Sequence, residues 1–433
     1  MSQTVIGLLG IGILSAMLMI GLDVGFSMLV TGFIGFAMIG GWGAALANMA
    51  ILPFDTLNNY FFAVLPLFIL MGSFCAEGQI GKDAYDMART WFGSARGGLA
   101  IATIGACGLF AAITGTTLAG SLVMGKVAYP EMRKAGYKMP LAAGVVSVGG
   151  TLGILIPPSM GFILIGMMTD LNVGELFMAG LVPGIIVVIF YMGTIMVWSK
   201  IDPKLAPLTP KSTWKQKFTS VRLTWPVVLL FLVIMGSIYT GVCTATEAGA
   251  IGAFGALIIP LARRQMSRKA FWNSLMDCAR MTAMIIILMV GAYTFNAFMA
   301  ITQIPTTFGD FLVGLSIPRW GIMFFILAFY LIAGTFFDPI SILILTISIF
   351  YPAVQALGFN LIWYSVIMVR LIEIGQISPP AGINLFGLKG VIDAPMSAIF
   401  KGVLPFLATD VLNLLLLCFF PVICTFLPNL MNY

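Results

Sequence analysis

The chain has 433 residues, of which 60% are hydrophobic and 9% are charged, and its formal net charge is +6. A soluble globular domain carries about 25% charged residues, so this composition excludes a water-soluble fold. The sequence has no histidine, which removes the commonest general base and metal ligand and excludes Ser-His-Asp hydrolysis.

Apolar runs of about 18 residues or more recur along the chain, which is the length that a helix needs to cross the hydrocarbon layer. The runs are continuous, whereas transmembrane strands alternate apolar and polar residues. The sequence therefore predicts an all-α, polytopic membrane protein that begins with scaffold helices over residues 1–58. Residues 1–20 lack a basic leader and merge into the first span, so we expect no cleavable signal peptide.

The basic residues predict the orientation in the membrane. Lys and Arg are enriched in cytoplasmic loops, and one topology places 20 of the 22 basic residues on the same side. That side is predicted to be the cytoplasm, and both termini are then predicted to be periplasmic. We interpret residues 199–269 as a basic cytoplasmic linker followed by further scaffold helices. The five basic groups lie at 82–96, 126–138, 200–222, 263–280 and 389–401.

Landmarks of the first half return in the second half. All are displaced by the same number of positions, the interval from Tyr129 to Tyr351, and this shared spacing indicates an internal repeat. We call this spacing the repeat interval, and we place the two copies at residues 59–198 and 270–433. The paired landmarks are YPEMRKAGY (129–137) with YPAVQALGF (351–359), GILIPPS (153–159) with GQISPPA (375–381), and AGLVPG (179–184) with KGVLPF (401–406).

Each copy contains an apolar stretch that we expect to turn back inside the membrane. The stretch at about 97–126 has basic residues at both ends, so it should enter from the cytoplasm and return there as a re-entrant hairpin with ITGTT at its tip. Its counterpart at about 319–351 carries AGTFFD at the tip, and both of its ends are predicted to lie outside. The two halves would then be inverted, which is typical of secondary transporters rather than of channels or membrane enzymes.

A helix that Pro-Pro should break follows each hairpin, at about 139–170 and about 360–388. Each Pro-Pro pair removes two amide donors and pushes the preceding residue out of the helical conformation. Non-helical backbone persists at membrane depth only where protein or a water-filled cavity satisfies it. The breaks at Pro157-Pro158 and Pro379-Pro380 are therefore predicted to leave carbonyl oxygens available as ligands for a small cation.

Oxygen atoms of the tips and breaks form the candidate ion site. Ligation by oxygen without histidine fits Na⁺ better than a transition metal. The alternative is that Pro-Pro and Gly-Thr are ordinary kinks of packed membrane helices, but their pairing by the repeat favours the ion site. The candidate Na⁺ ligands are Thr114, Gly115, Thr116, Thr117, Gly153 and Pro157 in the first half, and Gly334, Thr335, Asp338, Gly375, Ser378 and Pro379 in the second half.

Ionisable residues inside apolar segments are candidate functional residues. Arg370 and Glu373 lie at i and i+3, a spacing that lets them pair on one helix face. They could form a buried structural pair or provide a countercharge for the substrate, and Asp410 receives no assigned role. The residues predicted to contact the substrate are Thr116, Pro158, Ser159, Arg370, Pro380 and Asn384.

Seven segments spread over essentially the whole chain together resemble one known family, the large membrane subunit (DctM type) of tripartite ATP-independent periplasmic (TRAP) transporters. No single segment would be specific, but their combination is. The segments are WFGSARGGLA (91–100), AAITGTTLAG (111–120), PEMRKAGY (130–137), GGTLGILIPPSMGFILIG (149–166), LFMAGLVPG (176–184), EIGQISPPAGINLF (373–386) and LPF (404–406).

The resemblance implies an elevator-type carrier of the ion transporter superfamily, driven by Na⁺ and located in a bacterial inner membrane. It implies two protein partners, namely a periplasmic binding protein that delivers an organic anion, such as a carboxylate or sulfonate, and a small four-helix membrane subunit. We expect neither an organic cofactor nor an enzymatic activity. The rival interpretations are a stand-alone Na⁺-coupled anion carrier, a channel, and a membrane enzyme that acts on a lipid. The family's tips and breaks correspond here to residues 114–117, 153–159, 334–338 and 375–384.

Overall fold

The computed structural model describes residues 2–209, 212–314 and 317–431, and every regular element in these ranges is a helix. Pro210 and Lys211 of the predicted basic linker lie outside the described residues. The first half contains α1 (Gln3–Met19), α2 (Val24–Gly40), α3 (Trp42–Leu57), η1 (Tyr60–Ala63), α4 (Val64–Glu77), α5 (Ile80–Phe92), α6 (Gly98–Thr114), α7 (Thr117–Lys134), α8 (Met139–Thr151), η2 (Leu152–Ile154), α9 (Met160–Thr169) and α10 (Val173–Ile201). The second half contains α11 (Trp214–Tyr239), α12 (Ala245–Ala262), α13 (Arg268–Thr302), α14 (Ile304–Gly314), α15 (Arg319–Phe336), α16 (Pro339–Ala356), α17 (Leu361–Ile377), α18 (Ile383–Lys389), α19 (Met396–Phe419), α20 (Val422–Thr425) and η3 (Pro428–Leu430).

The predicted all-α class is confirmed, and the helices fit a multi-pass membrane protein. Among the described residues, six helices are long and apolar enough to cross a membrane, and the number rises to eight if each of two bent helix pairs is one span. One bent pair is α4 with α5, whose axes differ by 62°. The six helices are α10, α12, α13, α15, α16 and α19.

The helix bounds follow the same repeat interval as the sequence landmarks. Helix α16 begins and ends one repeat interval after α7, and α17 begins one repeat interval after α8. The correspondence extends to α2 and α12, whose bounds match the interval within the usual uncertainty of helix ends. The repeat in helix bounds therefore reaches helices that the sequence prediction treated as scaffold. The inversion of the two halves in the membrane stays a prediction.

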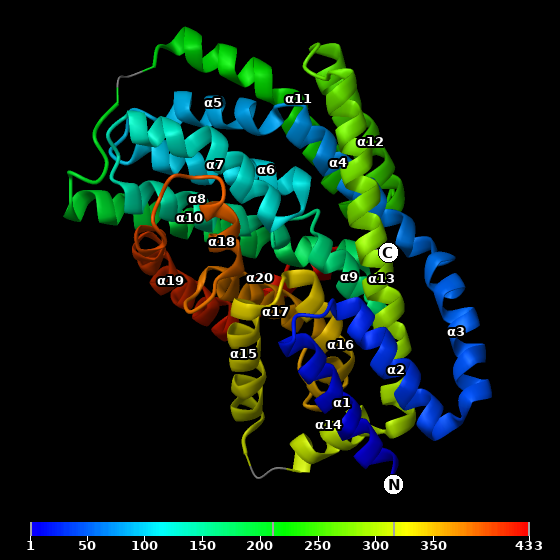
Figure 1. Cartoon of the computed structure of the whole chain (residues 1–433). Helices are drawn as coiled ribbons and strands as arrows, with labels where there is room; N and C mark the ends of the chain where they lie inside the picture. The colour runs from blue at the N-terminus through cyan, green and yellow to red at the C-terminus, as the bar shows by residue number, and fades with distance from the viewer. Residues whose placement is uncertain (1, 210–211, 315–316, 432–433) are drawn as a thin grey trace.

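Two groups of helices can be distinguished by their packing. Helix α13 runs along one side of the molecule and packs against α2, α3 and α4, while α12 packs against α4 (Figure 1). On the other side, α8 packs against α6, α7 and α19, and α17 packs against α15, α16 and α19. We call the first group the scaffold group and the second the hairpin group. Helices α5 and α6, among others, connect the two groups.

The predicted tips lie between helices of the hairpin group, and the predicted breaks follow its helices α8, by way of η2, and α17. Helices α6 and α7 are joined by Gly115 and Thr116, and α15 and α16 are joined by Phe337 and Asp338. Residues 155–159 separate η2 from α9, and residues 378–382 separate α17 from α18. Both Pro-Pro peptide bonds are cis. Whether each helix pair enters and leaves the membrane on one side stays a prediction.

Candidate functional site

The first tip is a backbone turn that contacts the first break. Gly115 has a φ of +63°, a left-handed conformation that glycine adopts without steric cost. Its N–H donates to the carbonyl of Ala111 at 3.1 Å, which ends α6, and its own carbonyl accepts from the N–H of Met160 at 3.3 Å. The hydroxyl of Thr114 donates to the carbonyl of Phe110 at 3.0 Å. The tip is therefore joined by a hydrogen bond to the start of α9.

The first break leaves no room for a side chain at Gly153. A Cβ atom at this position would meet the backbone of Thr116, whose carbonyl carbon would lie 2.6 Å away. The buried hydroxyl of Ser159 donates to the carbonyl of Ile154 and accepts from the N–H of Phe162 at 3.4 Å, so it caps α9. The tip and the break therefore form one unit lined by backbone, which we call the first tip–break unit.

The second tip also contacts the second break, but through an acceptor that lies two positions earlier in the repeat than Gly115. The N–H of Gly382 donates to the carbonyl of Thr335 at 3.2 Å. A Cβ at Gly375 would lie 2.7 Å from the backbone of Gly334, so the two helices approach closely there. The hydroxyls of Thr335 and Ser378 donate to carbonyls of their own helices, at 2.8 and 2.6 Å. These residues form the second tip–break unit.

Asp338 caps α16 in this structure. Its Oδ1 accepts from the N–H groups of Ile340 and Ser341, each at 3.1 Å, which is the arrangement of an N-cap carboxylate. Thr116 occupies the equivalent position at the start of α7, one repeat interval earlier, but its side chain makes no capping hydrogen bond. The two tips therefore differ in backbone conformation, since Gly115 is left-handed and its counterpart Phe337 is extended, and they differ in how their N-cap side chains are used.

The two tip–break units interlock across the halves. Helix α9 of the first half packs against α16 of the second, and α18 packs reciprocally against α7. The buried side chain of Asn384, at the start of α18, donates from Nδ2 to the carbonyl of Ser147 in α8 at 3.2 Å. The structure thus brings the predicted residues of both halves into one assembly of helix ends.

A cavity of about 350 Å³ lies beside the first tip, and we call it the tip cavity. It is lined by Thr114 and Thr116 from the tip, and by Glu77, Asp277 and Arg280 from the scaffold group. Sequence reasoning missed these three charged residues and placed Arg280 in a cytoplasmic basic group. The i, i+3 spacing of Asp277 and Arg280 could have marked them as one helix face.

Arg370 is the centre of a second polar site, buried in the hairpin group. Its Nη1 lies 2.8 Å from Oε2 of Glu373, and its Nη2 forms an ion pair with Oδ1 of Asp410. The guanidinium also donates from Nε to Oδ1 of Asn413 at 3.2 Å and from Nη2 to the hydroxyl of Tyr191 at 3.4 Å. All five side chains are buried. We call this set the Arg370 cluster.

The geometry of the Arg370 cluster favours a buried structural ion pair over a role of Arg370 as a countercharge for the substrate. Two carboxylates face one guanidinium, so its charge is compensated within the protein. The Oε1 of Glu373 and the Oδ2 of Asp410 have no hydrogen-bond partner among the described residues. The predicted pairing of Arg370 with Glu373 is present, and Asp410 gains a partner. Sequence reasoning missed Tyr191 and Asn413, which the repeat interval relates to each other.

A cation at either tip would be held mainly by neutral oxygen atoms. In residues 2–209, 212–314 and 317–431, no three side chains of His, Cys, Asp or Glu gather as a metal site. The tips and breaks offer threonine and serine hydroxyls and backbone carbonyls, with Asp338 as the single carboxylate of the predicted set. Such hard oxygen donors are suited to Na⁺ rather than to a transition metal.

Comparisons with known proteins show the following similarities. Residues 11–423 match the family described as "Tripartite ATP-independent periplasmic transporter, DctM component". The chain is 33% identical over 386 residues to the C4-dicarboxylate TRAP transporter large permease protein DctM of Pseudomonas aeruginosa, covering 89% of this chain and 90% of the relative. It is 31% identical over 388 residues to the isethionate TRAP transporter permease protein DctMQ of Oleidesulfovibrio alaskensis, covering 87% of this chain and 60% of the relative.

Comparison with solved structures shows a similarity in fold. The YdaH transporter of Alcanivorax borkumensis superposes with a TM-score of 0.64, covering 88% of this chain and 89% of that chain. The two sequences are 14% identical, so the similarity concerns the fold alone.

Proposed function

The chain belongs to the DctM family of tripartite ATP-independent periplasmic transporters, and on that premise we propose that it imports an organic anion by Na⁺-coupled secondary transport. The family membership confirms the resemblance carried by the seven sequence segments. It makes the chain a large permease subunit and a transporter rather than an enzyme. Coupling to Na⁺, the anion and the elevator movement are the proposed part.

The observation that carries the proposal is that a backbone hydrogen bond joins tip and break in each half. Met160 donates to the tip carbonyl of Gly115, and Gly382 donates to the tip carbonyl of Thr335. A Na⁺ ion held by neighbouring carbonyl and hydroxyl oxygens would strengthen the same contact, since it would attract oxygen atoms of tip and break together. Na⁺ binding would thus order both tips before the substrate binds. The proposed ligands remain the tip and break residues that the sequence predicts.

The proposed substrate is a carboxylate or a sulfonate. One relative is named for C4-dicarboxylates and another for isethionate, so both anion classes occur in the family. The tip cavity carries Arg280 but also the carboxylates of Glu77 and Asp277, so it is less suited to an anion than the region of the breaks. We expect the anion to bind between the two breaks, close to Pro158, Ser159, Pro380 and Asn384.

The proposed movement is a slide of the hairpin group against the scaffold group. A ligand shifts such an equilibrium only by its difference in affinity for the two states. Na⁺ and the anion together must therefore bind more tightly to the conformation in which the hairpin group is able to slide. The family implies a small membrane subunit and a periplasmic binding protein as partners in general. We propose that the small four-helix subunit stabilises the scaffold group, and that the binding protein delivers the anion at the periplasmic face of a bacterial inner membrane.

The test is uptake into liposomes that contain the chain and its small subunit. A labelled C4-dicarboxylate and isethionate would each be offered with and without a Na⁺ gradient, and with and without a binding protein loaded with the same anion. We expect uptake only when the small subunit, the gradient and the binding protein are all present. Uptake driven equally by a proton gradient would contradict the Na⁺ proposal.

A stand-alone carrier is the second candidate. This hypothesis assumes the same fold and the same ion sites as the proposal above. It differs only in that transport requires no binding protein. Na⁺-dependent uptake of free anion by the chain, at the rate measured with the binding protein, would establish this candidate instead. Currents much faster than carrier turnover would indicate a channel.

A further inference from the structure

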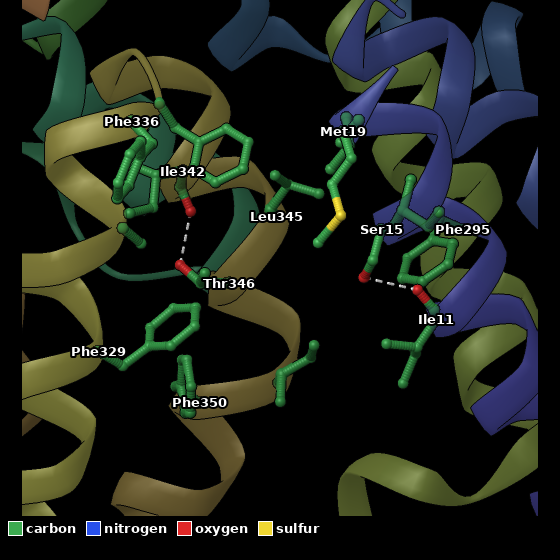
Figure 2. A pocket seen from close by; sticks show the side chains of 15 residues that line it. Ile11, Ser15, Met19, Phe295, Phe329, Phe336, Ile342, Leu345, Thr346 and Phe350 are labelled. Atoms are coloured by element: carbon green, nitrogen blue, oxygen red, sulfur yellow. Dashed lines mark hydrogen bonds between the residues drawn. The ribbon is translucent and has the colours of Figure 1, made fainter. Parts of the chain in front are cut away.

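A second and larger cavity, of about 760 Å³, lies between α1 and the helix pair α15 and α16 (Figure 2). Ser15 and Met19 lie on the α1 side, and Phe329, Leu345 and Thr346 lie on the opposite side. Phe295 of α13 completes the wall next to α1. The cavity thus lies between α1 and α13 on one side and the second tip on the other. We call it the seam cavity.

The polar groups of the seam cavity are already satisfied. None of its lining residues is charged, and the hydroxyl of Ser15 donates to the carbonyl of Ile11 at 2.8 Å. The hydroxyl of Thr346 donates to the carbonyl of Ile342 at 2.6 Å and accepts from the hydroxyl of Tyr330 at 2.8 Å. A carboxylate or sulfonate would lose its hydration there and gain no charged partner. The cavity is therefore unsuited to the transported anion.

The seam cavity is continuous with the surface that faces the lipid. Met19 is 88% exposed and Phe336 is 55% exposed, and both line the cavity. Beyond its rim, α15 presents Phe325 and Ile332, which are 67% and 63% exposed. Helices α15 and α16 are both long and apolar enough to cross a membrane, so these exposed side chains would lie in hydrocarbon. The cavity opens where bilayer acyl chains are the neighbouring molecules.

We propose that the seam cavity binds one acyl chain of a bilayer phospholipid. The volume lies within the range of about 300–1,000 Å³ that is usual for ligand pockets, and apolar cavities in proteins take up apolar ligands. Without an occupant, the aromatic side chains of the lining would lack contacts on one side. An acyl chain supplies those contacts and demands no hydrogen bond.

The bound chain would support the second tip. Phe336 and Phe337 line the cavity and directly follow Thr335, whose carbonyl accepts from Gly382. An occupant that packs against these two phenylalanines therefore limits the movement of the tip away from the second break. This role adds a lipid contact to the tip and does not depend on which ion or anion is transported.

The test is photo-crosslinking in liposomes that contain the full chain and a phosphatidylethanolamine with a photoreactive group in its acyl chain. We expect labelled peptides from α1, α15 and α16. Leu345→Trp adds bulk inside the cavity and should lower this labelling at least fivefold. The matched control is Ile332→Trp, which places the same side chain on the exposed face of α15 outside the cavity lining, and it should leave the labelling unchanged.

A second variant and a second condition complete the test. Ser15→Phe fills the cavity from the α1 side and should also lower labelling. The conclusion then does not depend on correct folding of the Leu345→Trp variant alone. Equal labelling of the filled and control variants would overturn the proposal. Loss of labelling when the small subunit is added would also overturn it, because a helix of that subunit would then be the occupant. Since no transport is measured, these outcomes are separate from failure of Na⁺-coupled uptake.

Discussion

Each tip–break unit has a backbone hydrogen bond between tip and break, but the two units differ in the position of the acceptor and in their side chains. In each, an amide of the break donates to a carbonyl of the tip, from Met160 to Gly115 and from Gly382 to Thr335. The helices beside them diverge, since α17 carries Arg370 where α8 carries Val148 at the equivalent position of the repeat. Both halves thus combine a tip with a broken helix, but only the first tip turns at a left-handed glycine, and the buried charge belongs mainly to the second half.

The largest expected effect concerns this buried charge. Arg370→Met leaves the carboxylates of Glu373 and Asp410 buried without their partner, and removal of one partner of a buried pair costs about 3–5 kcal/mol. Val148→Met, the corresponding change in the first half, disturbs only apolar packing and should cost about 1–3 kcal/mol. Thermal unfolding of the purified variants in one detergent measures both.

A triple variant separates charge from packing in the Arg370 cluster. Arg370→Met with Glu373→Gln and Asp410→Asn removes all three charges, and it should recover most of the stability lost in Arg370→Met alone. If Arg370→Met is as stable as the wild-type protein, the cluster is not a structural ion pair. The interpretation of Arg370 as a countercharge for the substrate would then gain support.

The second prediction tests whether the two units are equivalent. Gly153→Ala places a Cβ against the backbone of Thr116, and Gly375→Ala places one 2.7 Å from the backbone of Gly334. Backbone cannot move as easily as a side chain, so we expect each variant to lower Na⁺-dependent uptake at least tenfold and stability by about 1–3 kcal/mol. Liposome uptake and thermal unfolding are the measurements.

The control for these variants is Gly193→Ala in α10, where a Cβ would meet nothing within 4 Å. Replacing glycine by alanine inside a helix, where the added Cβ has free space, should raise stability by up to about 1 kcal/mol and leave uptake unchanged. If Gly153→Ala lowers uptake and stability and Gly375→Ala does not, only the first unit needs its close backbone contact.

The third prediction distinguishes capping from ion binding at Asp338. Asp338→Asn keeps a good N-cap for α16 and removes the charge, whereas Asp338→Ala removes both and should cost about 1 kcal/mol of stability. If the carboxylate binds Na⁺, both variants should raise the Na⁺ concentration for half-maximal uptake at least tenfold. Uptake titrated against Na⁺, together with thermal unfolding, measures the two effects.

Thr116 is the matched position in the first tip. Its side chain caps nothing, so Thr116→Ala should change the Na⁺ dependence with little change in stability. A normal Na⁺ dependence in Asp338→Asn would limit Asp338 to its capping role. The two tips would then differ in chemistry as well as in sequence.

Several parts of the fold followed from local sequence patterns. The break predicted at about 139–170 corresponds to α8 and α9, which span residues 139–169, because Pro-Pro interrupts a helix wherever it occurs. The first hairpin was predicted to end near residue 126, but α7 continues to Lys134. Apolar composition stops at the edge of a span, while helical conformation can extend into the more polar sequence beyond it. Helix α16 extends past its predicted end for the same reason.

Contacts between distant segments could not be predicted in the same way. The i, i+3 spacing shows that Arg370 can reach Glu373, but Asp410, Asn413 and Tyr191 come from two other helices. Their approach to Arg370 depends on how α10, α17 and α19 pack, which no local pattern specifies. The charged scaffold residues of the tip cavity were missed for the same reason.

The smallest expected effect concerns an exposed ion pair that only the first half has. Lys138, just before α8, lies with its Nζ 3.1 Å from Oδ2 of Asp202, which ends α10. The hydrogen bond from Lys138, with one from the N–H of Lys204, lowers the pKa of Asp202. The corresponding position in the second half is Asn360, which caps α17 by accepting from the N–H of Trp363 at 3.0 Å.

The two arrangements should respond differently to pH. Because the folded-state pKa of Asp202 is lowered, its contribution to stability is present above the unfolded-state pKa of about 3.9 and is lost as the pH falls through the folded-state pKa. We therefore expect Asp202→Asn to lower the melting temperature slightly at pH 7, and this difference from the wild-type protein to disappear in acid. Asn360→Ala removes an uncharged cap, so its cost should be the same at both pH values. If the melting temperature of Asp202→Asn stays below that of the wild-type protein at a pH below the folded-state pKa, Asp202 contributes through packing rather than through its charge.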